Sequence, residues 1–179
     1  CNSLEEITLP ATTQWVDENA FPQGVKITCE NKELIPFGNN GLHRAEYVSI
    51  SGTRDYQKAY EVLALVNAER KKAGLNELIW DDTVAAAAAT RSIEIEKSFS
   101  HTRPDGRTFG TAITDLGITY RGAGENIAWG QKTPETVMNA WMNSEGHRTN
   151  ILNPNFKKLG VGYRTNGQGT PYWTQLFTY

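Results

Sequence analysis

The chain has little cysteine, no long apolar run and no large excess of either charge. Cys1 and Cys29 are the only cysteines in 179 residues, which is too few for a disulfide framework, and their spacing matches no zinc motif. No apolar stretch approaches the roughly 20 residues that span a bilayer. The net charge is −2, without the basic excess of a nucleic-acid binder, so we expect no nucleic-acid partner.

Length and composition are those of an ordinary globular protein. Apolar residues make up 39% and charged residues 21%, and the length suits one domain or one domain with an appendage. The pattern changes near residue 54, from proline- and glycine-broken sequence to helical periodicity. We therefore predict an N-terminal extension over residues 1–54 and a single domain over residues 55–179.

The position of Cys1 has three explanations. It is the lipid-bearing cysteine of a bacterial lipoprotein, it pairs with Cys29, or it marks only a boundary of the sequence. A disulfide would hold an N-terminus that is otherwise usually disordered, which favours the Cys1–Cys29 pair. Lipid and disulfide both place the protein outside the reducing cytosol. The only membrane association expected is a lipid anchor at Cys1.

The N-terminal extension has signals for a small β element. Residues 25–28 alternate in polarity and read as a strand, and residues 33–35 are its expected hairpin partner. A strong turn signal, Gly-Asn-Asn-Gly, follows at residues 38–41.

Residues 55–179 begin with helices and end with strands. Helices are expected over 56–73, from a cap at Asp81 or Asp82 to about 98, over 108–116 and over 134–144, and strands over 159–163 and 172–179. Thr133-Pro134 provides an N-cap followed by a proline at the first helical position. This order predicts an α+β domain in which helices cover a sheet.

Four side chains stand out as candidates for a functional site, His101, Glu125, Glu145 and His147. Residues two apart on a helix point about 200° apart, so Glu145 and His147 would need a break to face one target. Gly146 could supply that break in the left-handed conformation. Imidazole and carboxylate groups suit zinc or acid–base chemistry. The spacing alone leaves a purely structural role equally open.

Five motifs around these residues carry a resemblance to a known family. They run in order through residues 56–179: Leu-Val-Asn-Ala-Glu-Arg (65–70), Ser-His-Thr-Arg-Pro-Asp-Gly (100–106), Gly-Glu-Asn-Ile-Ala (124–128), Trp-Met-Asn-Ser-Glu-Gly-His-Arg-Thr-Asn-Ile-Leu (141–152) and Leu-Gly-Val-Gly-Tyr (159–163). In these motifs the chain resembles the CAP superfamily (cysteine-rich secretory protein, antigen 5, pathogenesis-related 1), especially its bacterial secreted members.

The resemblance implies a three-layer α-β-α sandwich with an open cleft, located extracellularly or at the cell surface. It implies that His101, Glu125, Glu145 and His147 form the cleft tetrad, in which His101 and His147 bind a divalent metal, zinc above others, weakly. Many bacterial members of the family have proline at the position of Glu145. This chain keeps the glutamate, so the resemblance implies a complete tetrad. Residues 1–54 match nothing in the family.

Three functions follow from the resemblance, and the first is favoured. In the first, the domain is a non-enzymatic, monomeric binding module whose cleft holds a metal and a lipid, peptide or protein ligand. Alternatively it is a metal-dependent hydrolase or peptidase with Glu125 or Glu145 as general base. In the third alternative the tetrad only braces an interaction scaffold.

Overall fold

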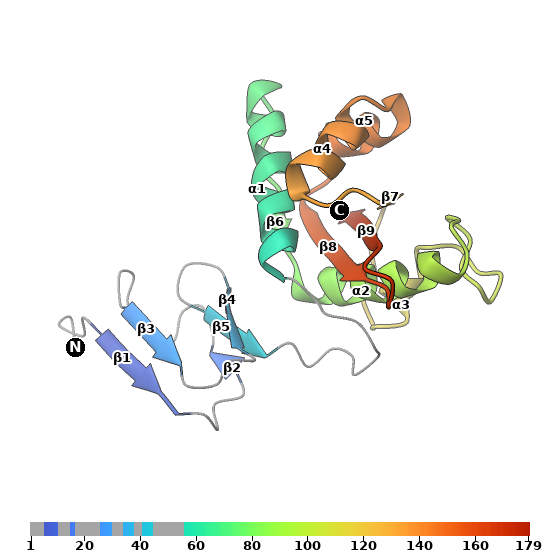
Figure 1. The fold of residues 1–179 in the computed structure, drawn as a ribbon. Coiled ribbons are helices and arrows are strands. Elements are labelled where there is room, and N and C mark those ends of the chain that lie inside the picture. Colours follow the sequence, from blue (N-terminus) through green and yellow to red (C-terminus); the bar gives the residue numbers. More distant parts are fainter. Residues whose placement is uncertain (1–5, 11–14, 17–25, 30–33, 38–40, 45–55) are drawn as a thin grey trace. The chain divides into compact units, whose positions relative to one another are not determined.

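The computed structural model describes residues 6–10, 15–16, 26–29, 34–37, 41–44 and 56–179 (Figure 1). The chain divides into two compact units, Cys1–Ile50 and Ser51–Tyr179. In the described part of the chain, no helix has the length and apolar character needed to cross a membrane.

The first unit contains two small sheets. Strand β1 (Glu6–Leu9) pairs in parallel with β3 (Lys26–Cys29). Strand β5 (Gly41–Arg44) lies between β2 (Trp15–Val16) and β4 (Leu34–Phe37) and is antiparallel to both. β structure in the N-terminal extension is therefore present, as the sequence predicts.

The predicted strand partners within this unit are wrong. β3 pairs with β1 and not with β4, and β4 forms its antiparallel pair with β5, where Phe37 lies opposite Gly41. The strong turn signal at residues 38–41 thus marks the hairpin. The predicted lipid or disulfide at Cys1 lies outside the described residues.

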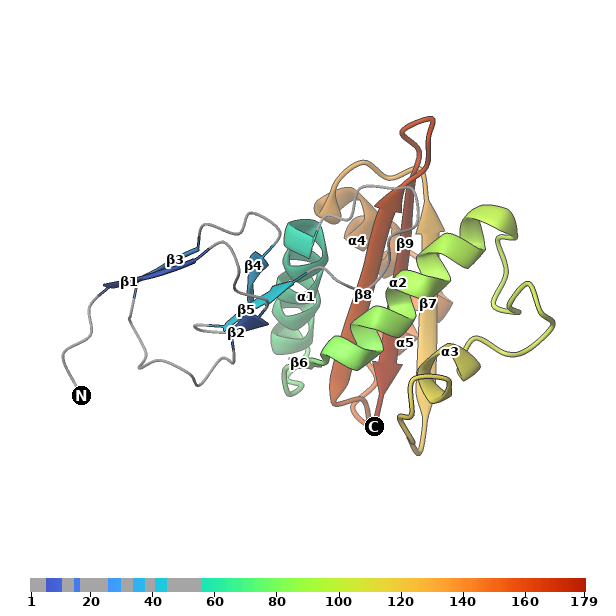
Figure 2. The same cartoon turned by 90° about the horizontal axis from the view of Figure 1, so that it is seen from below.

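A four-stranded sheet forms the middle layer of the second unit. Its order is β6 (Ile79–Trp80), β8 (Lys158–Thr165), β9 (Pro171–Thr178) and β7 (Ala123–Trp129). β6 is parallel to β8, and β9 is antiparallel to both of its neighbours. The C-terminal strand β9 is therefore interior, with β7 and β8 on either side (Figure 2).

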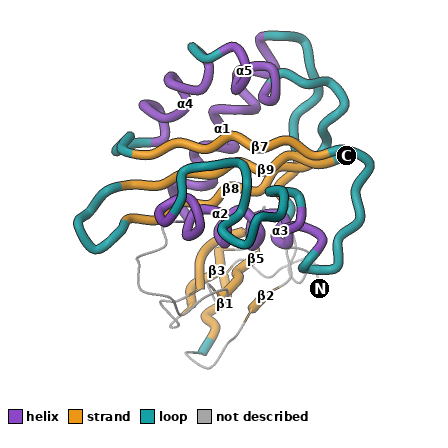
Figure 3. The backbone as a smooth tube through the Cα atoms, turned by 90° about the vertical axis from the view of Figure 1, so that its right-hand side faces the viewer, coloured by secondary structure: helices purple, strands orange, loops and turns teal. Residues whose placement is uncertain are grey.

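Helices cover both faces of this sheet. Helices α2 (Asp82–Lys97) and α3 (Thr111–Thr114) lie on one face, and α1 (Tyr56–Lys72), α4 (Pro134–Met142) and α5 (Glu145–Ile151) lie on the other (Figure 3). The domain is an α+β three-layer sandwich, which confirms the fold class expected from the sequence.

The two faces have separate apolar cores because the side chains of β9 alternate between them. Trp173 and Phe177 join the cluster beneath α1 and α4, which also contains Val62, Val66, Val137 and Trp141. Leu176 joins the cluster beneath α2 and α3, with Val84, Ala87, Ala88 and Ile113.

Several helix ends follow the signals in the sequence. The Asp81 side chain accepts a hydrogen bond from the Val84 N–H at 2.9 Å and caps α2. Thr133 caps α4 with Pro134 in the first turn. Gly74 follows α1 with a φ of +70°, a conformation that favours glycine.

Helix α2 approaches β8 closely because both surfaces are small. A Cβ at Gly160 would lie 2.2 Å from the Ala85 nitrogen, and a Cβ at Gly162 would lie 2.2 Å from the Ala88 oxygen. The alanine run of α2 and the two glycines of β8 are therefore two halves of one contact, in agreement with the close helix packing expected from the alanines.

The single helix predicted over residues 134–144 is followed by a second one, and this changes the role of Gly146. Ser144 is extended (φ −102°, ψ 123°) and starts α5, so Gly146 lies inside that helix and has no positive φ. The predicted left-handed turn at Gly146 is wrong. The freed Met142 carbonyl at the end of α4 accepts a 2.7 Å hydrogen bond from Arg148 Nη1, which stabilises the break.

The third helix is shorter than predicted. The sequence favoured residues 108–116, and α3 spans only Thr111–Thr114. Its start is delayed because Thr108 forms a β-bridge with Thr102.

Candidate functional site

The carboxylate of Glu125, in the middle of β7, lies at the centre of the candidate site. Its side chain and that of Arg91 in α2 are both completely buried. Arg91 donates from Nε to Oε2 at 2.7 Å and from Nη2 to Oε1 at 3.3 Å. The pair neutralises two charges in a place where either alone would be very unfavourable.

His101 contacts this carboxylate and is itself 58% exposed. Its Nδ1 lies 2.7 Å from Glu125 Oε1. Because a carboxylate only accepts hydrogen bonds, Nδ1 is the donor in this contact, which leaves Nε2 as the ring nitrogen available to a cation. A carboxylate behind the ring is the usual way to orient a metal-binding histidine.

His147, in α5, is half-buried, and its Nδ1 is buried with no hydrogen-bond partner among the described residues. Burial lowers the pKa of His147, and an electrostatic interaction with His101 lowers it further. The two rings are therefore within electrostatic reach of each other, and His147 is neutral near pH 7. A buried nitrogen without a partner is rare and indicates a water molecule or an ion.

Consecutive residues of β7 anchor both histidine-bearing segments. The Asn126 amide donates to the His147 carbonyl oxygen at 3.1 Å and to Gln175 Oε1 at 2.9 Å. Asn150 donates to Asn126 Oδ1 at 2.9 Å and to the Glu125 carbonyl oxygen at 3.1 Å. Adjacent strand side chains point to opposite faces, so β7 holds the His101 segment through Glu125 and the His147 segment through Asn126.

Glu145 differs from the other three predicted site residues. It is exposed in the first turn of α5, and its carboxylate forms no hydrogen bond or ion pair with the described residues. On a continuous helix the side chains of Glu145 and His147 point about 200° apart. The structure thus links His101, Glu125 and His147, and shows no contact from Glu145 to them.

Among the described residues of the site, the groups left to bind a metal are the imidazole nitrogens. Within the described ranges, no group of three or more histidine, cysteine, aspartate or glutamate side chains could hold a metal ion. Both Glu125 oxygens already accept hydrogen bonds, so this carboxylate stands behind His101. Among the described residues, Nε2 of His101 and the unpartnered Nδ1 of His147 are the nitrogens that would hold a cation, with water as the remaining ligands.

A chain of ion pairs extends behind the site, and the sequence did not reveal it. Arg91 also contacts Glu94 at 2.6 Å, Arg103 contacts Glu94 and Asp115 at 2.7 Å each, and Arg107 reaches Asp115 at 2.7 Å. The three-residue spacing of Arg91 and Glu94 on one helix was the only sequence signal of it.

These ion pairs change the titration of their acids. Burial alone would raise the pKa of Glu94, but hydrogen bonds from Arg103 and Arg91 outweigh it and hold the pKa below its usual range. Hydrogen bonds from Arg107 and Arg103 lower the pKa of Asp115 to about 2. The loop that presents His101 is thus fastened by charges that persist well into acid.

Two hollows of the surface lie away from these residues. One, of about 390 Å³, is lined by residues between 148 and 154. The other, of about 690 Å³, lies at the end of β9. None of the four predicted site residues lines either hollow.

A three-layer sandwich with histidines anchored from both faces of one strand defines a class of domain, and comparison with known proteins identifies it. The family model described as "CAP: Cysteine-rich secretory protein family" matches residues 63–177. This chain belongs to the CAP family.

Relatives support the same assignment. The chain is 50% identical over 126 residues to protein YkwD of Bacillus subtilis (strain 168), covering 66% of this chain and 47% of YkwD. It resembles an extracellular SCP-domain protein from Bacillus anthracis str. Ames (32% identity, TM-score 0.64, 69% of this chain and 41% of that one). It therefore spans less than half the length of both relatives.

Two further structures extend the comparison. An outer surface protein from Borrelia burgdorferi has 25% identity and a TM-score of 0.64 over 71% of this chain and 97% of its own. The structure of NaASP2 with Zn²⁺, at 15% identity and a TM-score of 0.53 over 69% of this chain and 80% of that one, shares the fold alone.

Proposed function

We propose that this chain is an extracellular or surface-attached binding module in which His101 and His147 hold a divalent cation, with zinc as the first candidate. The observation that carries the proposal is the pair of imidazoles, one oriented by Glu125 and one with a buried Nδ1 that no described residue satisfies. Extracellular and outer-surface relatives support the location, and the zinc-containing structure of a distant relative supports the choice of metal.

Each residue of the site has a separate task in this proposal. Glu125 fixes the His101 ring, Arg91 balances the charge of Glu125, and Asn126 fixes the backbone of His147. When bound, a divalent cation supplies a Lewis-acidic centre to which a lipid, peptide or protein ligand with an oxygen donor can add. With only two protein nitrogens, we expect weak and exchangeable binding.

The hydrolase alternative has less support. A general base needs a carboxylate free to take a proton. Both oxygens of Glu125 accept hydrogen bonds from Arg91 and His101, and Glu145 contacts none of the other site residues. We therefore propose binding and not catalysis.

Titration calorimetry of the full chain with zinc chloride tests the proposal. We expect binding near pH 7.5 to be lost in both His101→Ala and His147→Ala and retained in His43→Ala, which removes the third histidine of the sequence. Binding should weaken as the pH falls below about 6.5, because protons compete for the imidazoles. Zinc binding in His101→Ala and His147→Ala equal to that of the parent would refute the assignment.

A further inference from the structure

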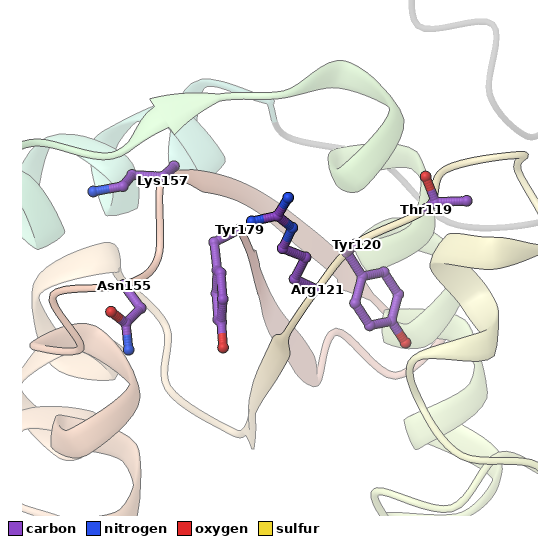
Figure 4. Close-up of a pocket in the computed structure, with 6 residues that line it drawn as sticks. All are labelled: Thr119, Tyr120, Arg121, Asn155, Lys157 and Tyr179. Carbon is purple, nitrogen blue, oxygen red and sulfur yellow. The ribbon is translucent and has the colours of Figure 1, made fainter.

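The larger hollow has none of the four candidate site residues in its lining. It is lined by Thr119, Tyr120, Arg121, Asn155, Lys157 and Tyr179 (Figure 4). Its volume of about 690 Å³ falls within the range of small-molecule pockets. We call it the Tyr179 pocket.

Sheet topology places two cationic side chains on either side of Tyr179. Arg121 comes two residues before β7, and its N–H donates to the Tyr179 carbonyl oxygen at 2.8 Å. Lys157 comes directly before β8, and its N–H donates to the Thr178 carbonyl oxygen at 2.9 Å. β7 and β8 are separated by one strand, so their backbones are about 10 Å apart. An anionic group between them is within reach of both long side chains.

Neither cation is neutralised by a described residue. No described residue forms an ion pair or side-chain hydrogen bond with Arg121 or Lys157, and the lining contains no acid. The neighbouring Lys158, in contrast, pairs with Asp81 at 2.7 Å. An open pocket with two unpaired positive charges attracts an anion.

An aromatic surface completes the pocket. The Tyr179 ring lies against Gly122, where a Cβ would be 2.3 Å from the ring, and its centroid is 5.9 Å from that of Phe156. Tyr179 is held in this way and still 44% exposed. Beside it, the side-chain amide of Asn155 forms no hydrogen bond with the described residues, and its backbone is fixed by a 2.9 Å bond to Asn153 Oδ1.

We propose that the Tyr179 pocket binds a phosphate ester of a small cyclic polyol, the size of a sugar phosphate. Arg121 and Lys157 hold the phosphoryl group, since guanidinium matches phosphate geometry and ammonium adds a point charge. The ring of the ligand lies on Tyr179, and Asn155 hydrogen-bonds a hydroxyl. Such a phosphoryl group comes either from a free sugar phosphate or from a phospholipid headgroup.

Calorimetry on the full chain at low salt, with three probes, tests this proposal. The probes are glucose 6-phosphate, inorganic phosphate, and vesicles of phosphatidylcholine with phosphatidylinositol, whose headgroup is a cyclic polyol phosphate, with glucose as the uncharged control. We expect glucose 6-phosphate to bind, and Arg121→Gln and Lys157→Gln each to weaken it about ten-fold or more. The charge-matched control Lys71→Gln, an exposed lysine of α1, should bind like the parent.

The outcomes identify the source of the phosphoryl group, and they show whether the Tyr179 pocket binds independently of the histidines. Vesicle binding without glucose 6-phosphate binding, abolished in Arg121→Gln, supports the phosphoryl site and identifies a headgroup as the source. The double variant His101→Ala/His147→Ala should lose zinc but keep phosphate affinity. No binding of any phosphate probe, or equal binding by the parent and both charge variants, overturns the proposal.

Discussion

At the scale of single residues, burial separates the two glutamates that the sequence treats alike. Glu125 is completely buried between Arg91 and His101, and Glu145 is exposed without a contact to the other site residues. Both lie beside glycine in family motifs, so motif matching alone assigns them equal weight. What distinguishes them is which elements pack above each carboxylate, and a sequence motif does not contain that information.

The same substitution at both positions measures this difference. We expect Glu125→Gln to lower the free energy of unfolding by about 3 kcal/mol, because Arg91 then loses its fully buried counter-ion and keeps only the partly exposed Glu94. Glu145→Gln should change it by less than about 0.5 kcal/mol. Urea unfolding followed by circular dichroism provides both values. Equal losses in the two variants would mean that Glu145 has a structural contact like that of Glu125.

Acid should loosen the loop behind His101 in a defined pH window. The pKa of Asp115 is about 2, below the ordinary 3.8, so the folded state binds its proton less readily than the unfolded state does. Its stabilisation is therefore complete above about pH 4 and is lost as the pH falls toward 2.

Asp115→Asn removes this titration. Its stability should fall less steeply than that of the parent between about pH 5 and about pH 2, measured as urea midpoints across the range. Parallel curves for the two proteins would show that the Arg107 and Arg103 bonds do not couple Asp115 to folding.

At the scale of elements, capping signals within one helical turn predicted most boundaries, and contacts that reach beyond one turn explain the failures. Caps at Asp81 and Thr133 lie where the sequence placed them because a cap depends on residues within one turn. The break between α4 and α5 depends on Arg148 reaching back to Met142. The partner of β3 likewise depends on β1, a strand much earlier in the chain. Neither contact is encoded in a local pattern.

The contact between α2 and β8 gives an element-scale prediction. Gly162→Ala would place a Cβ 2.2 Å from the Ala88 oxygen, and helix and strand must separate to admit it. We expect a loss of about 1–3 kcal/mol in the free energy of unfolding. Gly167→Ala, in the turn between β8 and β9 with nothing within 4 Å of its added Cβ, should be within about 0.5 kcal/mol of the parent. A neutral Gly162→Ala would show that the two elements are less tightly packed than described.

At the scale of the whole molecule, both apolar clusters of the described residues belong to the CAP domain and lie between Ala59 and Phe177. Buried Arg70 of α1 donates to the carbonyl oxygens of Asn76, Ile151 and Asn153 at 2.8 Å each. That one side chain joins the first helix to the segment before β8, so distant parts of the unit depend on each other.

A fragment of residues 51–179 should therefore fold by itself. We expect it to unfold in one cooperative transition, with a midpoint within a few degrees of the main transition of the full chain, because no element of its cores is removed. It should also keep zinc binding, since His101, Glu125 and His147 all belong to it. Differential scanning calorimetry and zinc titration of the fragment check both points. A fragment without a cooperative transition would show that residues 1–50 contribute to the fold of the CAP domain, and the predicted independence of the two units would be wrong.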